Sequence, residues 1–181
     1  MNKIVCYTDG SACVHYPKLG GFGIYIKTPE KNIKIRKGYC NTKTGRMEIM
    51  AALNCMRAIQ NKQAELIIYS DSQYVCNTVN EWIDNWRVIS YRDKANRDLL
   101  ELLHAEIHKF KIRPKLRHIK GHQDISCEHT LGNNIADEAA CYRTQESYEM
   151  DQPIALLELN NIELEDFEEI EGKTYYKKIN V

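Results

Sequence analysis

The sequence has no apolar run of membrane-spanning length, and its first residues, MNKIVCYTDG, lack the basic start and apolar core of a secretion signal. We therefore expect an intracellular protein, cytoplasmic or nuclear, without a membrane partner. A Cys-x-x-Cys pair is also missing, because the seven cysteines lie scattered between residues 6 and 141. This pattern favours neither a disulfide framework nor a zinc ribbon, and it predicts reduced thiols that lie mostly in the core.

Net charge is absent as well, since 25 basic residues balance 25 acidic residues. The balance hides an asymmetry: residues 151–181 hold eight acids and three lysines, a charge of −5, and residues 1–150 carry +5. A basic body suits a polyanionic partner, although a solvated surface is the commoner explanation of such a charge. The sharper hypothesis is that the acidic segment competes with such a partner for the basic surface.

What the sequence does contain is a regular succession of strand and helix patterns. Strands are expected at residues 4–7, 21–27, 32–39, 66–69 and 116–120, and helices around residue 48 and at 73–86, 96–110 and 133–143. Short connections make the first three strands antiparallel, and helical crossovers make the later strands parallel. The order predicts an α/β fold with a mixed sheet flanked by helices.

Two of these strands end alike, in IVCYTDGS and LIIYSDSQ. Each has four apolar residues that end in tyrosine, followed by a hydroxyl residue and an aspartate, Asp9 or Asp71. Ligands bind outside the carboxyl ends of strands in open α/β sheets, so the two aspartates converge if their strands are neighbours. Taken alone, each aspartate is better explained as a turn or cap residue.

Two further acids lie at the edges of apolar helical stripes. Glu48 is set in GRMEIMAAL and Asp137 in NNIADEAA. A carboxylate at such an edge is costly unless a positive group meets it, although Asp137 could instead be an acid near a helix N-terminus. Four converging carboxylates would repel one another and raise their pKa values. Mg²⁺, which prefers oxygen ligands, would resolve that repulsion.

The segments YTDGS, GRMEIMAA, YSDSQYV, KGH and GNNIADEAA, in this order, closely resemble type 1 ribonuclease H over residues 1–145. The resemblance implies a ribonuclease H-like fold with a five-stranded mixed sheet, in a catalytic domain of residues 1–148 followed by an acidic C-terminal extension, residues 149–181. It implies an endonuclease that hydrolyses the RNA strand of RNA/DNA hybrids and leaves 5′-phosphate and 3′-hydroxyl ends. It assigns Asp9, Glu48, Asp71 and Asp137 as ligands of two Mg²⁺ ions, with Mn²⁺ as a substitute. We expect a monomer.

The same resemblance assigns roles to five more residues. His122, in KGH, matches a histidine of a mobile loop that assists proton transfer or product release, whereas a lone loop histidine is usually just solvated. Gln73 matches a contact in the RNA minor groove, where 2′-hydroxyls distinguish RNA from DNA. Trp86 matches a tryptophan that packs on the DNA strand, and Asn96 an asparagine of a DNA-phosphate pocket. Lys43 stands where a phosphate-binding threonine is common.

The chain also departs from the family pattern. Gly45 replaces an asparagine or glutamine that contacts RNA, so the preference for hybrids is expected to be weaker. Between His122 and Asp137 the chain is longer than usual and brings Cys127 and His129, which we assign to a solvated loop and not to a zinc site. Two alternative functions stay open: a catalytically silent hybrid-binding module and a DNA-acting nuclease of the same fold.

Overall fold

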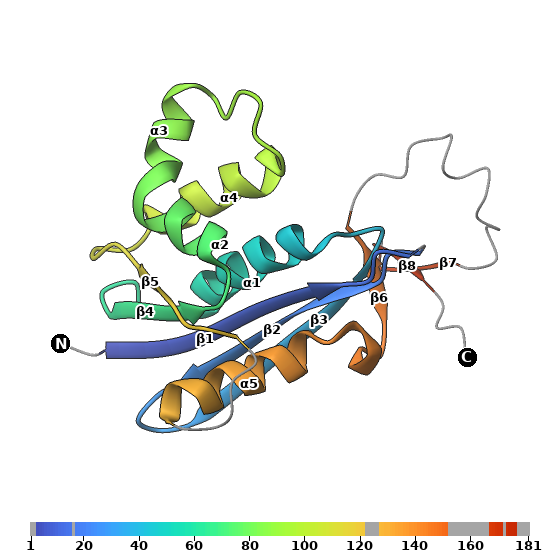
Figure 1. The fold of residues 1–181 in the computed structure, drawn as a ribbon, viewed down its shortest axis with the longest axis horizontal. Helices are drawn as coiled ribbons and strands as arrows, with labels where there is room; N and C mark the ends of the chain where they lie inside the picture. The colour runs from blue at the N-terminus through green and yellow to red at the C-terminus, as the bar shows by residue number, and fades with distance from the viewer. Residues whose placement is uncertain (1–2, 16, 122–126, 152–166, 172, 177–181) are drawn as a thin grey trace.

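The computed structural model describes residues 3–15, 17–121, 127–151, 167–171 and 173–176 of the chain. Within these residues one mixed sheet has eight strands in the order β5-β4-β1-β2-β3-β6-β8-β7 (Figure 1). The strands are β1 (Lys3–Ala12), β2 (Gly20–Lys27), β3 (Asn32–Cys40), β4 (Glu65–Ser70), β5 (Lys115–His118), β6 (Tyr148–Met150), β7 (Phe167–Ile170) and β8 (Lys173–Tyr176). β1 to β3 pair antiparallel, whereas β1, β4 and β5 pair parallel. The predicted α/β fold is confirmed, and β6, β8 and β7 add to the five predicted strands at the β3 edge.

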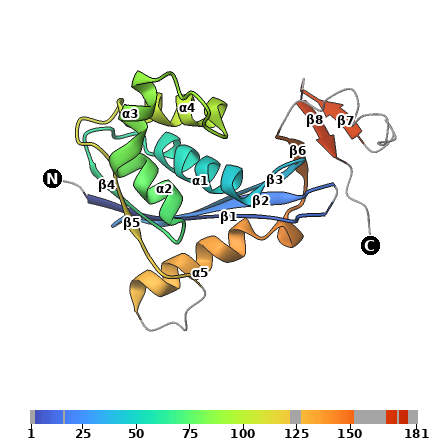
Figure 2. The same ribbon diagram turned by 45° about the horizontal axis from the view of Figure 1, so that its top comes forward.

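Helices cover both faces of this sheet. They are α1 (Thr44–Ala58), α2 (Gln73–Asn77), the π-helical turn η1 (Thr78–Trp82), α3 (Ile83–Val88), α4 (Arg97–Ile107) and α5 (Glu128–Ala140), followed by the 3₁₀ turn η2 (Tyr142–Thr144). Helix α5 lies on one face and α1 on the other, and α4 packs on the side of α1 that points away from the sheet (Figures 1 and 2). The main core therefore forms between the sheet and α1, and it continues outward to α3 and α4.

Two predicted helices differ from the observed ones. The helix expected at 73–86 is divided by η1, which separates α2 from α3. The helix expected at 133–143 begins at Glu128, so Asp137 lies in its last turn and the interpretation as an N-terminal acid is wrong. Of the two residues assigned to a solvated loop, Cys127 is exposed, as predicted, whereas His129 lies within α5. Cys127 is the N-cap of α5, and the His129 ring stacks on Tyr69 with centroids 4.1 Å apart.

The C-terminal part of the described chain joins the sheet at its β3 edge. β6 pairs parallel with β3, and β8 pairs antiparallel with β6. Hydrogen bonding therefore continues across residue 148, while the boundary proposed there between a catalytic domain and an extension stays a prediction. Four of the seven cysteines are buried. In the described part of the chain, no helix has the length and apolar character needed to cross a membrane.

Candidate active site

The register between β1 and β4 places Asp9 beside Asp71. Their parallel pairing ends where Thr8 lies opposite Ser70, and each aspartate is the next residue. Asp71 follows β4, as predicted. Asp9, however, lies inside β1, because antiparallel pairing with β2 continues to Ala12 and sets Asp9 opposite Gly23. The two carboxylates therefore meet where the parallel part of the sheet ends.

Glu48 reaches the same place because α1 lies very close to β1. A Cβ atom at Gly10 would overlap the backbone nitrogen of Glu48 and lie 2.8 Å from its Cα atom, so a side chain there would push α1 away. Ser72 Oγ donates a hydrogen bond of 2.6 Å to Glu48 Oε2 and also caps α2, because it accepts from the Val75 N–H. Ser72 was not predicted as a site residue, although its position between Asp71 and a helical pattern is that of an N-cap.

Asp137 completes the group from the opposite face of the sheet. Its carboxyl lies close enough to the carboxyl of Asp9 to raise the pKa of Asp9. The pKa of Asp9 is raised to about 8, mainly by burial and also by the negative charge of Asp71 and by Asp137, while the Gly10 N–H opposes the shift. Burial also raises the pKa of Glu48, with Asp71 adding to the effect and Ser72 opposing it. Among the described residues, no lysine or arginine is a main cause of either shift.

This donor set fits a hard divalent cation. Four carboxylates from β1, α1, the end of β4 and α5 offer only oxygen atoms, the ligands that Mg²⁺ and Mn²⁺ prefer. Asp9 is 7% exposed, so bulk water does little to relieve the repulsion. Asp9, Glu48, Asp71 and Asp137 could together hold such ions, and a bound cation would supply the positive charge that the side chains around them lack.

His122 lies outside the described residues, but the chain that leads to it is well placed. A Cβ atom at Gly121 would overlap Asp71 Oδ2, so this glycine lets the chain pass against the carboxylate. His118 Nε2 lies 3.1 Å from the backbone oxygen of Asp71. The predicted loop histidine therefore follows directly after a residue in contact with the carboxylate group.

Lys43 and Asn96, the two predicted phosphate contacts, stand at neighbouring helix starts. Lys43 is exposed and is the N-cap of α1, and Asn96 is the N-cap of α4 with a positive φ of 61°. Arg46 connects the two starts, because its Nη1 atom lies 3.4 Å from Asn96 Oδ1. Next to Lys43, Gly45 faces open space, since a Cβ atom there would have no neighbour within 4 Å.

The other two predicted substrate contacts lie on α2 and α3. Gln73 is exposed, and its side chain bonds Asn77 at 2.7 Å. Trp86 is half-buried, packs on the main core and carries the Lys94 ammonium 4.7 Å from its ring centroid. The Trp82 ring packs against it at an interplanar angle of 38°, with ring centroids 5.4 Å apart. Part of the Trp86 ring therefore contacts other residues of the chain, and only the remainder faces solvent.

Arg46 is a further polar residue near this site that the sequence did not single out. Its side chain is 6% exposed and forms ion pairs with Asp98 and with Asp151, whose side chain is fully buried. Arg46 Nε and Nη2 hold the two Asp151 oxygens at 2.7 and 3.0 Å, and Thr42 Oγ1 donates to Asp151 at 2.6 Å. The ion pair connects the start of α1 to the end of β6.

Comparison with known proteins identifies the family. The RNase H family model matches residues 1–145. "Ribonuclease H" of Francisella tularensis subsp. novicida is 33% identical over 144 residues, covering 77% of this chain and 89% of the relative. Among solved structures, LC9-RNase H1, "a type 1 RNase H with the type 2 active-site motif", has a TM-score of 0.61 at 17% identity and covers 77% of this chain and 71% of its own.

A foamy viral protease-reverse transcriptase in complex with RNA/DNA hybrid has a TM-score of 0.65 at 22% identity, over 77% of this chain. The chain spans about a fifth of that viral protein, 19%. At such identities the two structures support the fold alone. The family model matches the sequence over residues 1–145, a range that contains all four carboxylates, and the Francisella relative is 33% identical in sequence. The chain therefore belongs to the ribonuclease H family.

Proposed function

We propose that this chain is an endonuclease that hydrolyses the RNA strand of RNA/DNA hybrids with two divalent ions and leaves 5′-phosphate and 3′-hydroxyl ends. The observation that carries the proposal is the convergence of four carboxylates, in which Asp71 raises the pKa of both Asp9 and Glu48, and Asp137 raises the pKa of Asp9. Family membership supports the reaction class. The viral relative bound to a hybrid supports the substrate class.

Asp9, Glu48, Asp71 and Asp137 would hold the ions, Mg²⁺ by preference and Mn²⁺ as a substitute. When bound, the ions supply Lewis-acid chemistry that activates the attacking water and stabilises the leaving oxygen. Ser72 orients Glu48 through its 2.6 Å hydrogen bond. His122 would assist proton transfer or product release, at the end of a segment that passes against Asp71.

Lys43 and Asn96 would bind a phosphate of the DNA strand, since their helices start side by side around Arg46. Gln73 would contact the RNA minor groove, and the exposed part of Trp86 would pack on the DNA strand. Because Gly45 supplies no side chain beside Lys43, the RNA contact made there in relatives would be missing. We propose a monomer whose discrimination of hybrid from other duplexes is modest.

The test is cleavage of three labelled duplexes, an RNA/DNA hybrid, double-stranded RNA and double-stranded DNA, with and without Mg²⁺. We expect Mg²⁺-dependent cleavage of the RNA strand of the hybrid, with products that a DNA polymerase extends from their 3′-hydroxyl ends. Asp71→Asn should abolish cleavage and retain the fold and hybrid binding, because it preserves shape but removes a charge from the ion site. Asp93→Asn, at an exposed aspartate outside the site, is the matched control and should cleave like the wild type.

The same assay separates the alternatives. A silent hybrid-binding module would bind the hybrid and cleave none of the three duplexes. A DNA-acting nuclease would cleave the DNA duplex better than the hybrid. Turnover of Asp71→Asn near the wild-type rate would overturn the site assignment.

A further inference from the structure

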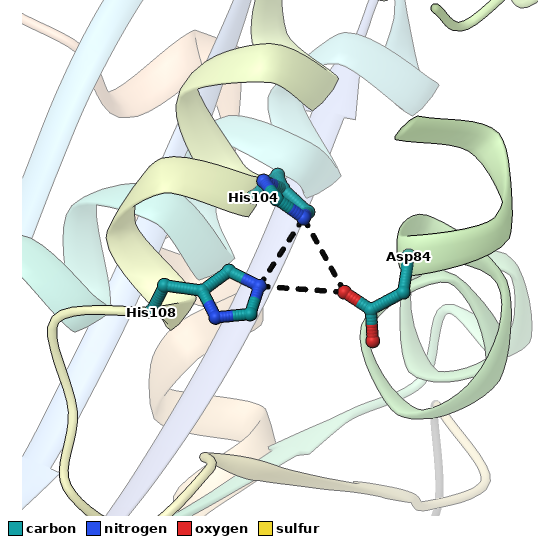
Figure 3. A group of neighbouring side chains, drawn as sticks. All are labelled: Asp84, His104 and His108. Carbon is teal, nitrogen blue, oxygen red and sulfur yellow. Dashed lines mark hydrogen bonds and ion pairs between the residues drawn. The ribbon is translucent and has the colours of Figure 1, made fainter. Parts of the chain in front are cut away.

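A second group of potential metal ligands lies between α3 and α4. Asp84 comes from α3, and His104 from α4, while His108 follows one turn later at the end of α4 (Figure 3). Among the described residues, this is the one trio of His, Cys, Asp or Glu whose ligand atoms all lie within 4.8 Å of one another. Its distances are 3.3 Å from His104 Nε2 to Asp84 Oδ1, 3.4 Å from His108 Nε2 to Asp84 Oδ1, and 3.2 Å between the two Nε2 atoms.

We propose that Asp84, His104 and His108 form a zinc site, separate from the carboxylate group and not required for its chemistry. The three ligand atoms form a nearly equilateral triangle. In a tetrahedral ion with bonds of about 2.0–2.1 Å, ligand atoms are about 3.3–3.4 Å apart, which matches the observed edges. A zinc ion can therefore sit just outside the plane of the triangle with little movement of the side chains.

The ligand types also select the metal. Two imidazole nitrogens and one carboxylate oxygen suit Zn²⁺ and related transition metals, whereas Mg²⁺ prefers oxygen ligands in an octahedral arrangement. The side chains of Asp84 and His108 are 50% and 57% exposed, so water can take the fourth position. An ion that enters from solvent needs no opening of the core.

Arg113 prepares Asp84 for this role. Its Nη1 atom donates to Asp84 Oδ2 at 2.8 Å and its Nη2 atom donates to the Val79 backbone oxygen at 2.7 Å. The arginine thus holds one carboxylate oxygen and leaves Oδ1 to face the histidines. Such a partner of a ligand fixes its orientation. Burial and the neighbouring His108 lower the pKa of His104, with Asp84 opposing this, which favours the neutral imidazole that binds metal.

The ion would link α3 to α4. The chain between these helices carries Arg92 and Lys94, and the Lys94 ammonium lies over the Trp86 ring. Zinc would hold both ends of this basic segment at a fixed spacing. The expected consequence is higher thermal stability, and the site should form in a chain whose catalytic carboxylates have been disabled.

The experiment is calorimetric titration of the untagged full chain with ZnCl₂ in saturating Mg²⁺, which occupies the carboxylate group. We expect one zinc per chain. The affinity should fall by at least about 10–100-fold in His108→Gln and in Asp84→Asn, because loss of a residue that only supports a metal ligand already has an effect of this size. His15→Gln, at an exposed histidine outside the trio, should bind zinc like the wild type. Asp71→Asn should do so too.

Two further measurements make the result decisive. Co²⁺ in place of zinc should give the intense visible absorption of a tetrahedral site, without the near-ultraviolet band of a thiolate ligand, and His108→Gln should lose it. Zinc should raise the melting temperature of the wild type more than that of His108→Gln, whose fold is checked by circular dichroism. The proposal would be overturned if the wild type bound no zinc or if Co²⁺ gave a thiolate band. It would also be overturned if both ligand variants bound zinc with the affinity of the wild type. A folded but nuclease-inactive wild type that binds zinc would overturn the proposed function alone.

Discussion

Arg46 forms ion pairs with the buried Asp151 and with the exposed Asp98. Replacing Asp151 by alanine should destabilise the chain more than replacing Asp98. Asp151 is fully buried and accepts three hydrogen bonds, two from Arg46 and one from Thr42. Its removal would leave a guanidinium with 6% exposure and only one acidic partner, Asp98. The two aspartates lift the pKa of Arg46 above its usual value against the opposing effect of burial, so Arg46 stays charged.

The size of the effect follows from burial. Removing one partner of a buried ion pair costs about 3–5 kcal/mol, and we expect the lower end, about 3 kcal/mol, because Asp98 keeps both of its hydrogen bonds to Arg46. For a chain of this size that loss lowers the melting temperature by about 6–12 °C. Asp98→Ala should cost about 1 kcal/mol or less, because its side chain is 63% exposed and water replaces the carboxylate.

Urea unfolding of the wild type, Asp151→Ala, Asp98→Ala and the double variant measures these differences. The matched pair removes the same carboxylate from the same arginine and differs mainly in burial. Equal losses in the two single variants would refute the argument from burial. A loss below about 1 kcal/mol for Asp151→Ala would show that β6 does not hold Asp151 against Arg46.

Three further predictions concern the carboxylate group and its surroundings. Burial and Asp71 raise the pKa of Asp9 from 3.8 to about 8, so the metal-free folded state loses stability as the pH rises from about 4 to about 8. In EDTA, Asp9→Asn should therefore raise the melting temperature at pH 8 and much less at pH 4. A larger rise at pH 4 than at pH 8 in calorimetry would contradict this. Gly45→Asn should fit without repacking, because a Cβ atom there has no neighbour within 4 Å. It should raise the ratio of hybrid affinity to double-stranded DNA affinity by roughly 5-fold, which corresponds to the net energy of about one hydrogen bond. An unchanged ratio would count against an RNA contact at this position. His122→Ala should slow single-turnover cleavage by roughly 10² at most, within the usual range for a general acid or base, whereas complete loss would give His122 a larger role.

The convergence of the carboxylates was predictable because it depends on local patterns. Equivalent apolar strands that pair in parallel bring Asp9 and Asp71 together, and helical spacing places Glu48 at the edge of a buried face. Asp137 was assigned to the group by resemblance, and its role as a metal ligand stays a prediction, whereas its position in the helix was predicted wrongly. The start of α5 was hidden because Cys127 is an unusual N-cap and Gly132 weakens the helical pattern.

Other features depend on contacts that no local pattern encodes. Arg46 and Asp151 are 105 residues apart, and they meet only because β6 adds to the edge of β3. The π-helical turn η1, TVNEW, contains no glycine or proline that would mark a break, so the division of the 73–86 helix was not visible in the sequence. His104 and His108 show an i, i+4 spacing, but Asp84 joins them only through the packing of α3 on α4.

The hypothesis that the acidic extension competes with nucleic acid needs a cut at a defined residue. Asp151, the first of the eight acids in residues 151–181, is committed to Arg46, which also reaches Asn96 at 3.4 Å. Truncation after Met150 would therefore damage the fold beside the proposed phosphate contact. Truncation after Asp151 removes seven of the eight acids and retains this ion pair. If the extension competes for the basic surface, this shorter chain should bind hybrid more tightly at low salt. Its binding should also depend more steeply on salt, because each added phosphate contact releases counterions. The rate of single-turnover cleavage should be unchanged. Identical salt curves for the full and shortened chains would reject the competition.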